Sequence, residues 1–455
     1  MNSVDKESLS LEQTFSKIGC GRFQIILVLL CGILQSFDAM ELLILAFLGQ
    51  ILSCEWKISV FEQSFLTTSV FIGAMFGGIL FGNLSDKYGR KSILVISSCF
   101  LIYTSMLSAF CPIIEWLIIF RTLIGFCLGG IMVSLSSLAS ELMPIENRGP
   151  ALMIILGFWP LGSYFLTTLS MITVPYYGWR VFLFISMVPL VITMPLFIWI
   201  PESPRFFLLN NRKPEALLIM NKISKINKSE PILHINSISK SSENSFYSIT
   251  DLLHPNYLLT TVTVNILWAV SGVSYYSIIM LIPLIHQIPH SCLHNFLLLP
   301  TNNSSSNKFD DTSCCIPMGW KSYSEIYIST TGELIFLILA IIMIKLLSRK
   351  LLMSIFCVIT ALSYMFLNLC MSKQLMSILL LIVRGSVFSM FNINYIYTSE
   401  VFPTSVRSLA LGICNLSARI GSILSPFIVN LLISRYSFSF GTIFLASLNI
   451  MSFIL

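Results

Sequence analysis

Charged residues are scarce in this protein. Only 11% of its 455 residues are Asp, Glu, Lys or Arg, whereas 55% are hydrophobic and the mean hydropathy is +0.85. An ordinary soluble protein has about 25% charged residues, so this composition excludes a soluble globule. The net charge of +6 is spread along an apolar chain, and no basic block resembles a nucleic-acid-binding patch. We therefore expect no nucleic-acid partner.

Signatures of enzymatic chemistry are also absent from the sequence. It contains no G-x4-GK[ST] phosphate loop, no H-E-x-x-H zinc motif and no G-x-S-x-G nucleophile turn. Three histidines recur every fourth residue from His286 to His294, but Pro289 interrupts the helix that would align them as zinc ligands. We expect neither enzymatic activity nor a resident metal or cofactor.

Long apolar runs are what the sequence has instead. A membrane-spanning helix needs about 20 consecutive, mainly apolar residues. The first run follows a mainly polar segment of 22 residues with mixed charge and has no small-residue cleavage site after it, so it is interpreted as an uncleaved span and not as a signal peptide. The predicted spans are 23–48, 64–83, 93–111, 116–138, 150–174, 180–200, 256–283, 324–344, 351–370, 375–397, 408–433 and 438–455.

The predicted spans fall into two sets of six. We expect a cytoplasmic N-terminal segment (1–22), a first six-helix half (23–202), a polar linker (203–255) and a second six-helix half (256–455) with an outer loop at 284–322. The linker is rich in Ser, Asn and Lys and has room for one short helix. The predicted fold class is an all-α polytopic membrane protein with twelve helices. Because the sequence stops within the last span, both a fragment and a divergent isoform stay open.

Lys and Arg are distributed unevenly between the loops. With the N-terminus inside, the inner loops carry 18 of these residues and the outer loops carry 6. The positive-inside rule therefore predicts that both termini are cytoplasmic. The outer loop also holds overlapping glycosylation sequons at Asn302 and Asn303, which require a lumenal or extracellular face. The two signals predict the same orientation.

An internal repeat relates the two predicted halves. The stretch ASELMPIENRGP (139–150) aligns without a gap with TSEVFPTSVRSL (398–409), and Ser, Glu, Pro and Arg match between them. Each copy lies at the inner end of the fourth span of its half. Two parallel six-span halves with a binding site near the midplane between them are the architecture of the major facilitator transporters.

The loop after the second span carries the most specific motif. GNLSDKYGRK (82–91) resembles the G-x-L-x-D-x-x-G-R-K/R motif of the major facilitator superfamily. Its two glycines permit a tight turn, and its Asp and Arg can pair with each other or with a neighbouring helix end. The alternative is a charged turn that only obeys the positive-inside rule. The resemblance implies a cytoplasmic network that latches the inner gate, with these members: Gly82, Asp86, Gly89, Arg90, Arg121, Glu141, Arg148, Glu202, Arg205, Glu400 and Arg407.

Further stretches narrow the resemblance. PESPRF (201–206) and YTSEVFPTSVRSLALG (397–412) resemble the branch that contains sugar porters and organic ion transporters, and within it the synaptic vesicle 2-related proteins. This resemblance implies a secretory or synaptic-type vesicle, or the plasma membrane, as the location. The second-half counterpart of the Asp motif is degenerate, because KLLSRK (345–350) has Lys345 in place of the acid and Ser348 in place of Gly. The degeneracy weakens the expectation of a symmetric latch.

Ionisable residues inside the spans are candidates for function, because one such residue at mid-bilayer costs about 2.5–3.5 kcal/mol on insertion scales. Gln35, Asp38 and Glu41 lie three residues apart in the first span, and we expect them to share one helical face that lines the central cavity. Two carboxylates so close do not ionise together easily in a partly dry site, which suits coupling to a proton or a cation. The alternative is that they pair with an arginine of a neighbouring helix and hold the bundle together.

Three arginines inside spans are the positive counterparts: Arg121, Arg384 and Arg419. Arg121 resembles the span-4 arginine of the superfamily, which implies a structural and gating role. By the same resemblance, the position of Arg419 is typically acidic in organic cation carriers and Arg in organic anion carriers. A guanidinium in a low-dielectric cavity is well suited to a carboxylate. The alternative is that Arg419 only neutralises Asp38 or Glu41.

Aromatic and amide side chains with polar tips complete the predicted site, since small-molecule pockets combine both. We expect a monomeric secondary-active transporter, surrounded by membrane lipid, that moves a small organic ion with an anion favoured, together with a coupled proton or cation. A non-transporting vesicle-membrane binding protein derived from a transporter, and a sugar porter, stay open as alternatives. The predicted substrate or coupling-ion site comprises Gln35, Asp38, Glu41, Tyr275, Tyr276, Arg384, Asn392, Tyr395 and Arg419.

Overall fold

The computed structural model consists of helices and their connections, with no strand, in the residues that it describes: 11–231, 252, 254–287, 320–369, 372–402, 406–433 and 438–454. Within these described residues, ten helical stretches are long and apolar enough to cross a membrane. One of them, Ile145–Trp199, contains two crossings because Gly178 interrupts the helix with a φ of 76°. With the shorter apolar helix at the end of the chain, these stretches confirm the expected all-α polytopic fold of twelve crossings.

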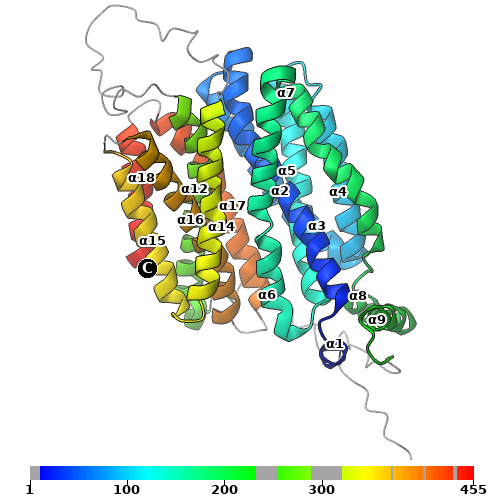
Figure 1. Ribbon diagram of the computed structural model, residues 1–455. Coiled ribbons are helices and arrows are strands. Elements are labelled where there is room, and N and C mark those ends of the chain that lie inside the picture. The colour runs from blue at the N-terminus through cyan, green and yellow to red at the C-terminus, as the bar shows by residue number, and fades with distance from the viewer. Residues whose placement is uncertain are drawn as a thin grey trace, which may run out of the picture.

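The two halves lie side by side (Figure 1), the first in blue to green on the right and the second in light green to red on the left. The first half contains α2 (Arg22–Glu55), α3 (Val60–Tyr88), α4 (Arg90–Ser108), α5 (Ile114–Glu141), α6 (Ile145–Leu156) and α7 (Trp159–Trp199). The second half contains α12 (Pro255–Gln287), α14 (Trp320–Met343), α15 (Arg349–Phe366), α16 (Lys373–Val401), α17 (Arg407–Phe427), the π-helix η2 (Ile428–Ile433) and α18 (Phe438–Ile454).

Helices are the structure that these apolar runs can form in lipid, because every backbone N–H and C=O must find a partner within its own segment. Side chains set some of the ends. At the start of α3 the Ser59 hydroxyl accepts a hydrogen bond from the Glu62 N–H at 3.2 Å, and the Glu62 carboxylate accepts one from the Ser59 N–H at 2.7 Å. This capping box fixes where the second crossing begins.

Small residues set how closely α3 and α5 pack. A Cβ on Gly77 would lie 2.8 Å from the Phe126 Cα, and one on Gly73 would lie 2.8 Å from the Phe126 N. The backbones therefore approach without intervening side chains, as expected for small residues spaced four apart in membrane helices. A Cβ on Gly78, the third glycine of the same stretch, would make only ordinary contacts, at 3.8 Å to the Val133 side chain and 3.9 Å to the Gly129 carbonyl oxygen.

The polar linker holds two short helices, α8 (Pro204–Leu209) and α9 (Lys213–Asn227), where the sequence suggested one. They lie with α1 (Leu11–Ile18) at one end of the bundle (Figure 1), which we call the linker end. The Asn227 Oδ1 accepts the Phe23 N–H at 3.0 Å, so α9 is fixed to the start of α2. The opposite end of the bundle is called the far end.

The two halves are joined at the far end. The Thr68 hydroxyl of α3 donates to the Ile423 carbonyl of α17 at 3.1 Å, and the Ser64 hydroxyl donates to the Pro426 carbonyl at 3.4 Å. A second contact forms between α7 and α14, where the Thr168 and Tyr327 hydroxyls are hydrogen-bonded. The structure is therefore a state in which the far end is closed.

Candidate functional site

A cavity of about 40 Å³ lies between the two halves, with walls from α2, α5, α6, α7, α12, α16 and α17. It is much smaller than the roughly 300 Å³ at which ligand pockets usually begin, so an organic ligand has to widen it on entry. Its polar lining consists of Gln35, Asp38, Asn392, Asn415, Arg419 and Ser422.

Asp38 is the least satisfied group in this cavity. Its side chain belongs to a residue that is 1% exposed, and neither of its carboxylate oxygens has a hydrogen-bond partner among the described residues. Arg419 lies across the cavity on α17, is partly exposed to it, and interacts electrostatically with Asp38. The hydroxyl of Tyr276 lies within hydrogen-bonding reach of Arg419. Burying a carboxylate without hydrogen-bond donors costs free energy. The Asp38 carboxylate is therefore available to bind a proton, a cation or a donor group of a ligand.

Glu41 does not line the cavity, and the expectation that it shares this face with Asp38 is wrong. Its Oε2 accepts a hydrogen bond from Arg121 Nη1 at 2.9 Å, and its Oε1 accepts one from the Ser105 hydroxyl at 2.6 Å. Glu41 and Arg121 are both 0% exposed. Three residues along a helix leave a rotation of about 60°, which is enough to turn Glu41 away from the cavity and toward α4 and α5. The alternative that stayed open from the sequence was that these acids pair with an arginine of a neighbouring helix, and this is what Glu41 does.

Arg384 also lies outside the cavity, contrary to the sequence-based expectation. Its Nε donates to Glu333 Oε1 at 2.7 Å, and both side chains are almost fully buried. The Tyr275 hydroxyl, which does line the cavity, donates to the same oxygen at 2.9 Å. Glu333 was missed although the criterion that selected Asp38, an acid within an apolar span, applies to it equally.

Aromatic side chains form most of the remaining cavity wall. They are Trp159, Tyr275, Tyr276, Phe388, Phe391 and Tyr395. The structure thus brings together the expected Tyr275, Tyr276, Asn392 and Tyr395 with Asp38, Gln35 and Arg419. Trp159 and Asn415 were not predicted from the sequence, because no pattern distinguishes them from the other aromatic and amide residues of the apolar runs.

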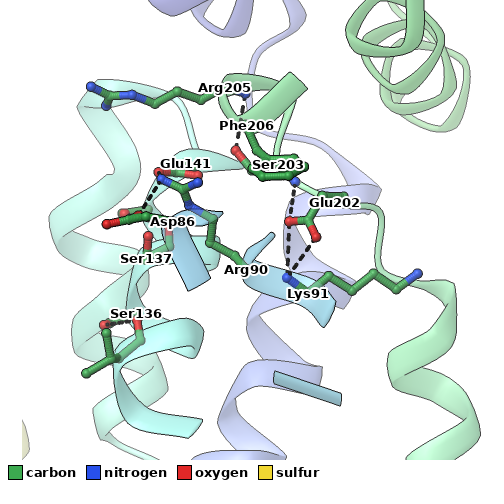
Figure 2. A network of polar contacts seen from close by, with 12 residues as sticks. Asp86, Arg90, Lys91, Ser136, Ser137, Glu141, Glu202, Ser203, Arg205 and Phe206 are labelled. Carbon is green, nitrogen blue, oxygen red and sulfur yellow. Dashed lines mark hydrogen bonds and ion pairs between the residues drawn. The ribbon is translucent and has the colours of Figure 1, made fainter. Parts of the chain in front are cut away.

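A network of charges lies at the linker end of the first half (Figure 2). Arg90 lies between two acids, with its Nη2 at 3.1 Å from Asp86 Oδ1 and at 3.1 Å from Glu141 Oε1. The Glu202 carboxylate accepts the Lys91 N–H, with its two oxygens at 3.1 and 3.2 Å. A carboxylate at the first turn of α4 also interacts favourably with the helix dipole. The network ties α3, α4, α5 and the segment before α8 together.

Several expected members of this network have other contacts. Gly82 lies within α3, where an added Cβ would be 3.6 Å from Val133 Cγ1, so it is not part of the turn. The Arg148 Nε donates to the Met143 carbonyl at 3.3 Å. The Arg205 side chain extends away from Glu202 in Figure 2.

Some expected site residues lie outside the description of the structure. The structure describes the backbone of Arg407 but not its side chain, and the predicted glycosylation sites Asn302 and Asn303 lie outside the described residues.

The degenerate loop of the second half keeps the central contact of this network. Arg349, which occupies the position of Arg90 in the motif, lies with its Nη2 3.0 Å from Glu400 Oε1 and with its Nε 3.1 Å from Glu400 Oε2. The Arg90–Glu141 pair therefore has an equivalent in the second half, although the acid of the motif is missing. Aligning KLLSRK with the first-half motif would have identified Arg349.

Gly89 provides a test of the linker-end network. Its φ is 103°, and an added Cβ would lie 2.9 Å from the Glu202 Cδ. We expect Gly89→Ala to cost about 1–3 kcal/mol of stability, because the backbone is strained and the Glu202 carboxylate is displaced from Lys91. Gly82→Ala is the matched control, since its Cβ makes only ordinary contacts. Thermal unfolding of the two purified variants measures the difference, and equal melting temperatures would contradict the expectation.

Comparisons with known proteins match these features. Residues 10–289 match the family model described as "Sugar (and other) transporter". The synaptic vesicle 2-related protein of Rattus norvegicus is 32% identical over 430 residues, which cover 94% of this chain and 76% of the relative. The protein of the same name from Xenopus laevis is 32% identical over 427 residues, with the same coverage. The inward open structure of the xylose transporter XylE from E. coli has a TM-score of 0.69 at 16% identity, covers 95% of each chain and shares the major facilitator fold.

Proposed function

Since the chain belongs to the sugar (and other) transporter family and is a multi-pass membrane transporter of the major facilitator type, we propose that it moves a small organic anion by alternating access. The observation that carries the proposal is the position of Arg419 in the cavity between the halves, opposite a carboxylate without hydrogen-bond partners among the described residues. The linker end faces the cytoplasm in this proposal, as the distribution of Lys and Arg indicates.

The proposed anion binds to Arg419. A guanidinium presents paired N–H donors that match a carboxylate, and the low dielectric of a cavity walled by aromatic side chains strengthens such a bond. The aromatic wall supports the proposal because it supplies apolar surface for the organic part of the substrate. The proposed location is a vesicle membrane, which is supported by the name of the vertebrate relatives, synaptic vesicle 2-related protein.

Asp38 is the proposed coupling group. When its carboxylate is ionised it neutralises Arg419 and competes with the substrate anion, whereas a protonated Asp38 leaves Arg419 free to bind a carboxylate. The charged and titratable groups that act on Asp38 are Arg419 from α17, Glu41 from its own helix, and the hydroxyls of Tyr276 and Tyr395 from α12 and α16. One proton and one anion then bind together, so anion binding strengthens as pH falls and weakens as pH rises.

Ligand-induced stabilisation tests this coupling. We expect organic acids to raise the melting temperature of the wild-type protein more in acidic than in neutral buffer. A ligand at about 100 times its Kd is expected to add about 2.7 kcal/mol to the free energy of unfolding. Asp38→Asn removes the competing charge, so organic acids are expected to stabilise this variant strongly and to the same extent at every pH. Asp86→Asn is the control, because its side chain is 75% exposed at the linker end. Loss of binding in Asp38→Asn, or an affinity of the wild-type protein that does not change with pH, would refute the coupling role.

The same ligand screen, combined with an uptake assay in proteoliposomes, discriminates the two competing functions. Stabilisation by sugars that persists in Arg419→Ala would favour a sugar porter, the function named for the structural neighbour XylE. Binding of anions without any transport would favour a non-transporting binding protein. The degenerate KLLSRK loop suggested that second function, but the Arg349–Glu400 pair shows that the loop still makes its central contact.

A further inference from the structure

Each half contains a buried acid paired with an arginine, and the two pairs differ. In the first half both carboxylate oxygens of Glu41 are occupied, one by Arg121 and one by Ser105. In the second half Glu333 Oε1 accepts the Arg384 Nε–H, whereas Glu333 Oε2 and Arg384 Nη2 have no hydrogen-bond partner in the described part of the chain. Arg121 Nε and Nη2 of the first pair likewise have no partner among the described residues, so the two pairs differ in the acid: both oxygens of Glu41 are occupied, whereas Glu333 keeps one oxygen without a hydrogen bond.

Glu333 is connected to the other half of the protein. The Tyr275 hydroxyl donates to Glu333 Oε1 at 2.9 Å, and the Trp159 Nε1–H donates to the Tyr275 oxygen at 2.5 Å. Trp159 belongs to α7 in the first half, whereas the other three residues belong to α12, α14 and α16 in the second half. We call the series Trp159, Tyr275, Glu333 and Arg384 the inter-half bridge.

The direction of each hydrogen bond in the bridge is fixed by chemistry. An indole N–H can only donate and an ionised carboxylate can only accept. The Tyr275 hydroxyl must therefore donate to Glu333, and this leaves its lone pairs to accept the hydrogen bond from Trp159. The bond between the halves thus depends on Glu333, and Arg384 holds Glu333 in place.

The bridge is part of the cavity wall. Both Trp159 and Tyr275 line the cavity, and their rings meet edge to face with centroids 6.1 Å apart. The bond exists in the state whose far end is closed by the contacts of Thr68 with Ile423. We propose that the inter-half bridge holds the halves in this arrangement, and that Glu333 and Arg384 are positioning residues that orient the Tyr275 hydroxyl toward Trp159. The inference rests on the proposed alternating access, in which the far end also opens.

Accessibility at the far end tests the bridge without any knowledge of the substrate. Thr68 is 3% exposed beneath the contact with Ile423, so a thiol introduced by Thr68→Cys is shielded while the far end is closed. Its labelling by a maleimide is quantified at that residue by peptide mass spectrometry, with the full chain in lipid nanodiscs. Trp159→Phe keeps an aromatic ring, although a smaller one, and removes the N–H donor. We expect it to raise the labelling rate about five-fold, as the net loss of one hydrogen bond implies.

Trp268→Phe is the matched control for this substitution. Trp268 is buried, as Trp159 is, but its Nε1–H donates to Thr398 Oγ1 at 2.9 Å within the second half. Removing that donor breaks no bond between the halves, so the labelling rate of the introduced thiol is expected to stay at the background value. An equal increase in both variants would mean that general loosening, and not the bridge, causes the labelling.

A double-substitution cycle tests the positioning role of Glu333. Glu333→Gln keeps an acceptor oxygen for Tyr275 but loses the charge that holds Arg384, so it is expected to raise the labelling rate by a smaller factor. Its combination with Trp159→Phe is expected to add nothing further, because the orientation of Tyr275 no longer matters once the Trp159 donor is gone. If Glu333→Gln does not fold, Glu333→Asp, which keeps the charge but shortens the reach toward the Tyr275 hydroxyl, replaces it in the cycle. Multiplicative effects of the two substitutions would overturn the positioning role, since a merely structural Glu333 would act independently of Trp159.

The outcomes separate this inference from the proposed function. An unchanged labelling rate in Trp159→Phe overturns the bridge. If the thiol is nevertheless labelled slowly in all variants, the far end still opens, and the proposed alternating access stands. A thiol at position 68 that is never labelled, with or without the bridge, overturns alternating access and the bridge together. A selective rise in Trp159→Phe supports both.

Discussion

Replacing Arg419 by alanine is expected to weaken the binding of organic anions by at least about 30-fold, the equivalent of roughly 2 kcal/mol for a truncated buried charge partner. Arg419 is the cationic group that lines the cavity, and no neutral donor of the wall replaces a guanidinium. Arg419→Lys is expected to recover only part of the affinity, because an ammonium keeps the charge but loses the paired N–H geometry. Thermal shift titrations with a panel of organic acids measure the affinities.

A matched control distinguishes the loss of the cavity arginine from the loss of an arginine elsewhere in the protein. Arg349 is an arginine near an acid, as Arg419 is, but it is paired with Glu400 at the linker end and lies outside the cavity. Arg349→Ala is therefore expected to leave the affinity for organic acids unchanged. Equal affinities of wild type and Arg419→Ala would contradict the anion site, and cations that bind through Asp38 would reverse the assignment of substrate charge.

Removing one member of the Glu41–Arg121 pair is expected to destabilise the protein by about 3–5 kcal/mol. Both side chains are 0% exposed, so either Glu41→Leu or Arg121→Leu leaves an uncompensated charge inside the first half. The large effect comes from that stranded charge and not from the intrinsic strength of the bond. Thermal unfolding of each purified variant measures the loss.

The double variant Glu41→Leu with Arg121→Leu checks this reasoning. Replacing a buried ion pair by apolar residues of similar volume is often neutral or stabilising, so the double variant is expected to be more stable than either single variant. The Ser105 hydroxyl loses its acceptor, Glu41 Oε1, in all variants that remove this acid. A double variant that is less stable than both single variants would show that the pair stabilises the helix bundle directly.

The spans were predictable because a membrane imposes a strong and simple constraint. Backbone groups in lipid must be satisfied within a helix, and the bilayer sets its length, so apolar runs of about 20 residues located nearly all the crossings. The less regular parts were not accessible in this way. Nothing in the composition of the linker showed that it forms both α8 and α9, because short polar helices depend on what they pack against.

The site was partly predictable for a related reason. An ionisable residue in an apolar span must face a cavity or a partner, and this criterion selected Asp38 and Arg419. It could not tell a cavity residue from a paired one, because that depends on helix rotation and on neighbours far away in the sequence. Glu41 and Arg384 were therefore assigned to the cavity although each is paired inside its own half.

Uptake into proteoliposomes tests the central claim most directly. The protein is reconstituted, an inward proton gradient is imposed, and the uptake of a labelled organic acid that stabilises the purified protein is compared between wild type and Arg419→Ala. The proposal predicts uptake above that of protein-free liposomes that depends on both the gradient and Arg419. An acid that binds to the wild-type protein but is never accumulated would contradict transport and favour a binding protein.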